Sequence, residues 1–75
     1  MLYTRSSFLT WLRKVHNCEI TPIEKSPVLI IENGVASARI WTSKKDLIDY
    51  EEIHRVCNVL YIVGLPGDKD LKKIE

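Results

Sequence analysis

Cysteine is scarce in this chain, which has only Cys18 and Cys57 among its 75 residues. A disulfide-stapled scaffold carries at least about four cysteines, and a zinc site needs closely spaced pairs of cysteine or histidine. The sequence has neither pattern. We therefore expect two reduced thiols that pack as small hydrophobic side chains, without a disulfide framework and without a metal or other cofactor.

Long hydrophobic runs and an excess of one charge are also absent. No stretch approaches the roughly 18 apolar residues of a membrane span, and the opening MLYTRSSFLTWLRK lacks the apolar run and cleavage site of a signal peptide. Basic residues number 11 and acidic residues 10, which leaves a formal net charge of +1. No global field therefore indicates a nucleic-acid or membrane partner. We expect a cytoplasmic protein with no membrane partner.

Catalytic and nucleotide-binding signatures are missing as well. The Gly-Leu-Pro-Gly stretch at 64–67 is not followed by the Gly-Lys-Ser/Thr of a P-loop. His16 and His54 are the only histidines. Cys57 follows His54 by one helical turn, but a buried thiol within a helix is a poor nucleophile. We expect neither an enzyme nor a small-molecule site.

The strongest signal that is present is a β-hairpin over residues 26–41, SPVLIIENGVASARIW. Asn33-Gly34 is the dipeptide that best tolerates the two positive φ angles of a type I′ turn, which would place Ile31 opposite Ala36. Side chains of a strand alternate between its two faces. One face is then entirely apolar and is assigned to the core: Leu29, Ile31, Ala36, Ala38 and Ile40. The other face is mixed: Val28, Ile30, Glu32, Val35, Ser37, Arg39 and Trp41.

Two amphipathic helices flank the hairpin. Residues 4–16 repeat apolar side chains at the helical spacing, and Asn17 is a plausible stop. Residues 42–58 predict a second helix with Ser43 as its N-cap. Residues 18–25 could form an edge strand or a loop, because Pro22 cannot donate to a sheet. Residues 59–63, VLYIV, could extend the second helix, but their β-branched and aromatic content favours a buried strand.

The expected fold is therefore one α+β domain spanning residues 1–75. Its order is α, a possible β, β, β, α, β and a short α that follows Asp68. The elements would form a three- to four-stranded mixed sheet built on the Asn-Gly hairpin. Both main helices would pack on the apolar face of that sheet.

The element order resembles two known groups. With residues 59–63 as a strand, αβββαβ is similar to the core of restriction-endonuclease-like nucleases, whose active site needs an acid-x-Lys on a strand where this chain has Ser37-Ala38-Arg39. With that segment helical, α-β-β-β-α resembles toxin ribonucleases of the HicA type and double-stranded-RNA-binding domains. Those toxins use a histidine on an early strand, and this chain has none between His16 and His54. A degenerate nuclease-like or toxin-like domain is the third reading of the function.

The candidate binding residues lie on the mixed face of the hairpin and just after it. Val28, Ile30 and Trp41 could form an apolar patch for a protein partner or for a second copy of the chain. The leading prediction is accordingly a non-enzymatic protein interaction module that self-associates through this face. The alternative is a small nucleic-acid-binding protein, in which Trp41 stacks on a base while basic side chains contact phosphates. The basic side chains concerned are Arg39, Lys44 and Lys45.

Overall fold

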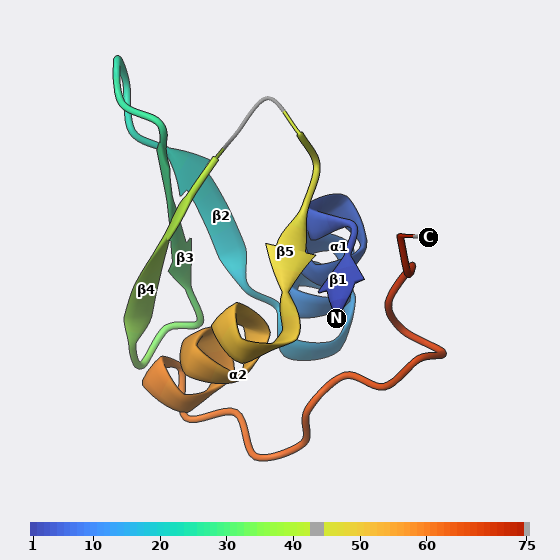
Figure 1. Cartoon of the computed structure of the whole chain (residues 1–75). Helices are drawn as coiled ribbons and strands as arrows, with labels where there is room; N and C mark the ends of the chain where they lie inside the picture. Colours follow the sequence, from blue (N-terminus) through green and yellow to red (C-terminus); the bar gives the residue numbers. More distant parts are fainter. Residues whose placement is uncertain (43–44, 75) are drawn as a thin grey trace.

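A computed structural model describes residues 1–42 and 45–74 and arranges them in two helices and five strands (Figure 1). In chain order the elements are β1 (Leu2–Tyr3), α1 (Arg5–His16), β2 (Glu19–Pro22), β3 (Val28–Glu32), β4 (Ser37–Trp41), β5 (Ile48–Asp49) and α2 (Tyr50–Val59). The expected α+β class with two main helices is confirmed.

The strands form two small sheets. β2, β3 and β4 make a three-stranded antiparallel sheet in that order, and β1 pairs antiparallel with β5. The expected single mixed sheet is therefore wrong, since each strand pair in the described chain is antiparallel. Both helices lie on the same side of the three-stranded sheet (Figure 1). The core between them contains Phe8, Leu12, Ile31, Ala38, Ile40, Ile53 and Val56.

The turn between β3 and β4 lies one residue later than the sequence predicts. Asn33 N–H donates to Ala36 O at 3.2 Å, so the two loop residues are Gly34, with φ of 89°, and Val35. The side-chain Oδ1 of Asn33 accepts from the N–H groups of Val35 and Ala36 at 3.0 and 2.8 Å. Asn33 therefore stabilises the turn from outside the loop.

This correction moves the pairing by two residues and leaves the faces intact. Ile31 lies opposite Ala38, and Leu29 lies opposite Ile40. Because side chains alternate with a period of two, a shift of two keeps the paired side chains on their expected faces, whereas a shift of one would have exchanged the faces. Val35, predicted on the mixed face, lies in the loop instead. Ile31, Ala38 and Ile40 are buried, as the apolar face requires.

α1 agrees with its prediction within one residue. The Thr4 Oγ1 accepts from the Ser7 N–H at the N-terminus, and Asn17 takes the left-handed conformation, with φ of 53°, at the C-terminus. Both positions carry residue types that favour those conformations. Val15 is 57% exposed and so lies outside the buried stripe of Phe8, Leu9, Trp11 and Leu12.

α2 begins at Tyr50, which corrects the predicted start at residue 42. Asp49 is the N-cap, and its Oδ1 accepts from the Glu51 N–H at 2.8 Å. Ile48 and Asp49, which the prediction placed inside the helix, instead form β5, because they pair with the N-terminal strand β1. The predicted cap at Ser43 lies outside the described residues.

Residues 59–63 do not form the predicted strand. α2 ends at Val59, and Tyr61 adopts φ of 58°. Tyr61 N–H donates to Asn58 O at 3.2 Å, and Ile62 N–H donates to Cys57 O at 2.8 Å. These two bonds are those of a Schellman motif, with tyrosine at the position that glycine usually occupies. α1, β2, β3, β4 and α2 thus follow the order α-β-β-β-α.

The C-terminal segment is fastened to β1. Thr4 N–H donates to Lys72 O at 2.7 Å, and Ile74 N–H donates to Leu2 O at 3.2 Å. The predicted helix after Asp68 is wrong, since residues 68–70 form a turn. No helix in residues 1–42 and 45–74 has the length and apolar character to cross a bilayer.

We predict that Asn33→Ala destabilises the fold because it removes the link from the hairpin turn to α2. Asn33 Nδ2 donates to the Leu60 carbonyl at 2.6 Å, and a partly buried carbonyl left without its donor costs about 1–3 kcal/mol. Urea unfolding should show a loss of this size in the free energy of unfolding. Asn58→Ala is the control: this exposed side chain makes only a 3.5 Å contact with His54, and we expect a change within about 0.5 kcal/mol. Equal losses for the two variants would contradict the prediction.

Candidate interaction site on the outer sheet face

The side of the β2-β3-β4 sheet that faces away from α1 and α2 is here called the outer face. Figure 1 shows both helices on the opposite side, and no element of the described chain lies over the outer face. The strand registers define the side chains on this face. They are Glu19 and Thr21 from β2, Ile23 just after it, Val28, Ile30 and Glu32 from β3, and Ser37, Arg39 and Trp41 from β4.

One end of the outer face is apolar. Val28 lies opposite Trp41, and Ile23 N–H donates to Val28 O at 3.0 Å, which places these three side chains in one row across the sheet. Trp41 is 74% exposed. It also lines an open cleft of about 220 Å³ beside β4, together with Ile40.

Ile30 extends this apolar surface to the middle of the face. It lies between Thr21 and Arg39, and it is only half-buried. An antiparallel sheet with one solvated face normally alternates apolar residues inside with polar residues outside. The apolar side chains on the outside of this sheet depart from that alternation.

The other end of the outer face is acidic. Glu19 lies directly opposite Glu32, and both side chains are exposed. Like charges placed opposite each other across a strand pair are destabilising. The ion pairs of the described chain are Arg55–Glu52 and Lys73–Asp68, so neither of these two glutamates has an ionic partner there.

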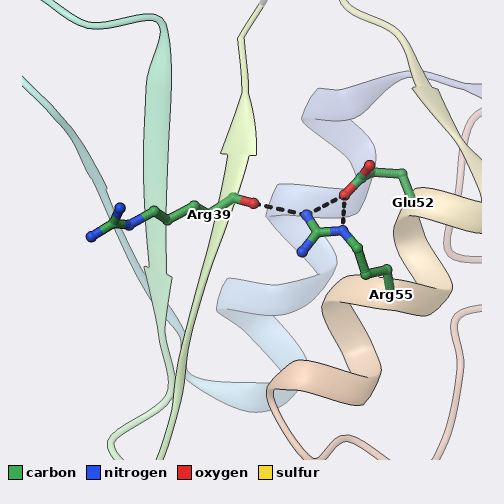
Figure 2. Close-up of polar contacts among 3 residues, drawn as sticks. All are labelled: Arg39, Glu52 and Arg55. Atoms are coloured by element: carbon green, nitrogen blue, oxygen red, sulfur yellow. Dashed lines mark hydrogen bonds and ion pairs between the residues drawn. The ribbon is translucent and has the colours of Figure 1, made fainter.

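Arg39 contributes two different groups to the site, as Figure 2 shows. Its backbone carbonyl accepts from Arg55 Nη2 at 2.8 Å, and Arg55 is itself paired with Glu52. Its side chain points away from α2 and passes over the sheet (Figure 2). The Arg39 guanidinium has no ionic partner in residues 1–42 and 45–74.

The structure thus brings four of the six predicted site residues together. Val28, Ile30, Arg39 and Trp41 share the outer face. The helix expected to begin before Lys45 begins later, so Lys45 lies in the connection between β4 and β5. Its backbone carbonyl accepts a hydrogen bond from Arg5 Nη1 at 3.3 Å. Lys44 lies outside the described residues.

Sequence reasoning missed three residues of this face: Glu19, Thr21 and Ile23. Residues 18–25 were open between edge strand and loop, so their side chains had no assigned face. The alternation from Glu19 to Thr21 was the available signal, and the edge position of Pro22 is compatible with it.

The two thiols are buried within the described chain. Cys18 and Cys57 are free and buried, and burial raises the pKa of both thiols, that of Cys57 to about 11. Both thiols therefore stay protonated at neutral pH. His54 is exposed, whereas Cys57, one helical turn later, is buried. Within the described ranges, no group of three or more His, Cys, Asp or Glu side chains is placed to hold a metal ion.

An open groove of about 460 Å³ separates α1 from the C-terminal segment. Lys14, Lys69 and Lys72 line it, but the serine hydroxyls beside them already have partners. Ser6 Oγ donates to Asp46 Oδ2 at 2.5 Å, and Ser7 Oγ accepts from the Lys72 N–H at 3.0 Å. These serine hydroxyls are therefore already engaged within the chain, and the groove is a weaker candidate site than the outer face.

Comparison of this chain with protein-family models, with curated proteins and with solved structures gives no match. No relative therefore assigns an activity to the outer face. Its function has to be inferred from the chemistry of the surface itself.

We predict that neither cysteine reacts with iodoacetamide in the folded protein at pH 8, except at the rate of unfolding. The neutral Cys57 thiol contributes stability that is fully present below its ordinary pKa of 9.0 and is lost as the pH rises through about 11. Mass spectrometry of time points from pH 8 to 11 should therefore show labelling that accelerates only toward the upper end. Protein unfolded in urea serves as the control and should label fully at pH 8. Rapid labelling of native Cys57 at pH 8 would show that the site is open.

Proposed function

We propose that this protein is a non-enzymatic interaction module that self-associates through the outer face. One observation carries the proposal: Ile23, Val28, Ile30 and Trp41 make a continuous apolar surface on a sheet side that no described helix covers. Aromatic and aliphatic side chains of this kind form the anchors of protein interfaces, and tryptophan is prominent among those that dominate the binding energy.

The size of the chain favours a second copy as the partner. A domain of about 60 residues buries only roughly 60% of the surface that its unfolded chain exposes, and this chain is only slightly longer. Its two helices cover one side of the sheet. A second copy that covers the other side would add apolar burial without further sequence.

Nucleic-acid binding through Arg39, Trp41, Lys44 and Lys45 is less well supported by this geometry. Glu19 and Glu32 share the outer face with Arg39 and Trp41. Their carboxylates would repel the phosphate backbone that a stacking and phosphate-contacting surface has to attract. The same carboxylates suit a protein partner that brings basic side chains.

We predict that the wild-type protein is a dimer and that Trp41→Ala dissociates it. An interface tryptophan of this kind is worth about 2 kcal/mol, and the dimer contains one from each copy, so the dissociation constant should rise by roughly 1,000-fold. The measurement is molecular mass by light scattering over a range of protein concentrations, at low and at moderate salt.

Tyr61→Ala provides a matched control for this experiment. Tyr61 is 76% exposed, close to the 74% of Trp41, but it lies in the segment after α2 and away from the outer face. Its removal should leave the mass unchanged. A monomeric wild-type protein at every concentration would overturn the proposal. Salt-sensitive binding of an oligonucleotide that Lys45→Gln weakens would then support the nucleic-acid alternative.

A further inference from the structure

The charges on the outer face are unbalanced within one chain. Glu19 and Glu32 oppose each other at one end without an ionic partner in the described chain, and the Arg39 guanidinium on the same face also has none. Arg39 lies one row nearer the apolar end than these glutamates do. Its side chain points away from the helices (Figure 2). The face therefore presents both members of an ion pair that the chain does not form with itself.

Symmetry restricts how a second copy can meet this face. Homodimers are mostly two-fold symmetric, and two sheets that pack face to face lie about 10 Å apart with their strands within about 30° of each other. The two-fold axis then lies between the sheets and runs either across the strands or parallel to them.

An axis across the middle of the strands gives a poor match. It keeps β4 over β4 and places the apolar end of one copy over the acidic end of the other. Val28 and Ile23 would then face Glu32 and Glu19, and Arg39 would face Arg39 of the second copy. Burial of unpaired charge against apolar side chains is costly.

An axis parallel to the strands matches the two faces. It places the apolar end over the apolar end and β4 of one copy over β2 of the other. Trp41 then lies over Ile23 and Val28 of the second copy. Arg39 lies over Thr21 of the second copy and one row from Glu19, within reach of two long side chains across such a gap. Glu32, on the central strand, lies over Glu32 of the second copy, and the two Arg39 side chains flank this acidic pair.

On the basis of the self-association proposed above, we propose that two copies of this chain pack outer face to outer face about an axis parallel to their strands. Arg39 of each copy pairs with Glu19 of the other. The apolar rows supply the burial, and the two symmetric ion pairs select this orientation. Charged pairs at interfaces fix register and partner choice in this way.

A charge exchange tests the pairing. In an Arg39→Glu homodimer, two acidic side chains meet at each contact, and in a Glu19→Arg homodimer, two basic side chains meet. Each variant alone should dimerise at least about tenfold more weakly than wild type. A mixture of the two variants restores both contacts. At one contact the new acidic side chain of Arg39→Glu meets the new basic side chain of Glu19→Arg, and at the other the unchanged Glu19 and Arg39 pair. The mixture should form a heterodimer with an affinity close to that of wild type.

The readout is native mass spectrometry of the mixture, with one variant made in a heavy-isotope form, and the dissociation constant is measured by light scattering. Arg13→Glu is the control for Arg39→Glu, because it makes the same change in net charge at an exposed site on α1. We expect this control to dimerise with wild-type affinity. A heterodimer of the two outer-face variants that forms in preference to either homodimer supports the pairing.

Two other outcomes overturn the proposal and can be told apart. If wild type is a dimer that Trp41→Ala dissociates, yet mixing the charge variants restores nothing, the orientation is wrong and the self-association stands. Equal affinities of Arg39→Glu for wild type and for Glu19→Arg, both higher than that of its own homodimer, would indicate the axis across the strands, because Arg39 then faces Arg39 and both of those partners keep it. If wild type is a monomer, the self-association itself fails, and the orientation fails with it.

Discussion

The structure depends on one arrangement: both helices pack on the same side of the three-stranded sheet. Ile31 and Ala38 are buried against α1 and α2 in a single core, and this burial is the main favourable term available to so short a chain. Apolar residues on the other side of the sheet are not part of this core. Val28, Ile30 and Trp41 are on that other side, where a sequence selected only for folding as a monomer would place polar residues.

The features that could be predicted from the sequence are those that depend on local periodicity. α1 has a 3.6-residue apolar repeat and suitable residues at both ends, and it forms where that pattern indicates. The hairpin faces are also as expected, although the turn is not where Asn33-Gly34 predicts. A period of two tolerates an error of two residues in the pairing, so Arg39 and Trp41 share a face under either register. Four residues of the candidate site could be grouped for this reason.

The features that could not be predicted depend on contacts distant in sequence or on rare backbone conformations. β5 forms because it pairs with β1 at the N-terminus, which is distant in sequence. Nothing in the local pattern around Ile48 indicates this pairing. Tyr61 ends α2 in a left-handed conformation that usually indicates glycine, so the apolar segment around it was taken for a strand. β2 was ambiguous for a third reason: an edge strand has half the hydrogen bonds of a central one and a correspondingly weak sequence signal.

The edges of the sheet are protected, which is consistent with the proposed association through its face. Ile23 N–H bonds to β3, so the alternation of an antiparallel ladder turns the backbone of Pro22 outward, where proline has no N–H to offer another strand. On the opposite edge, the outward carbonyl of Arg39 is occupied by Arg55, which Glu52 holds in place (Figure 2). Strand addition at either edge would have to overcome these features. The outer face has no such protection. It carries both the apolar row and the unmatched charges, so a partner that covered it would bury apolar side chains and pair charges at once.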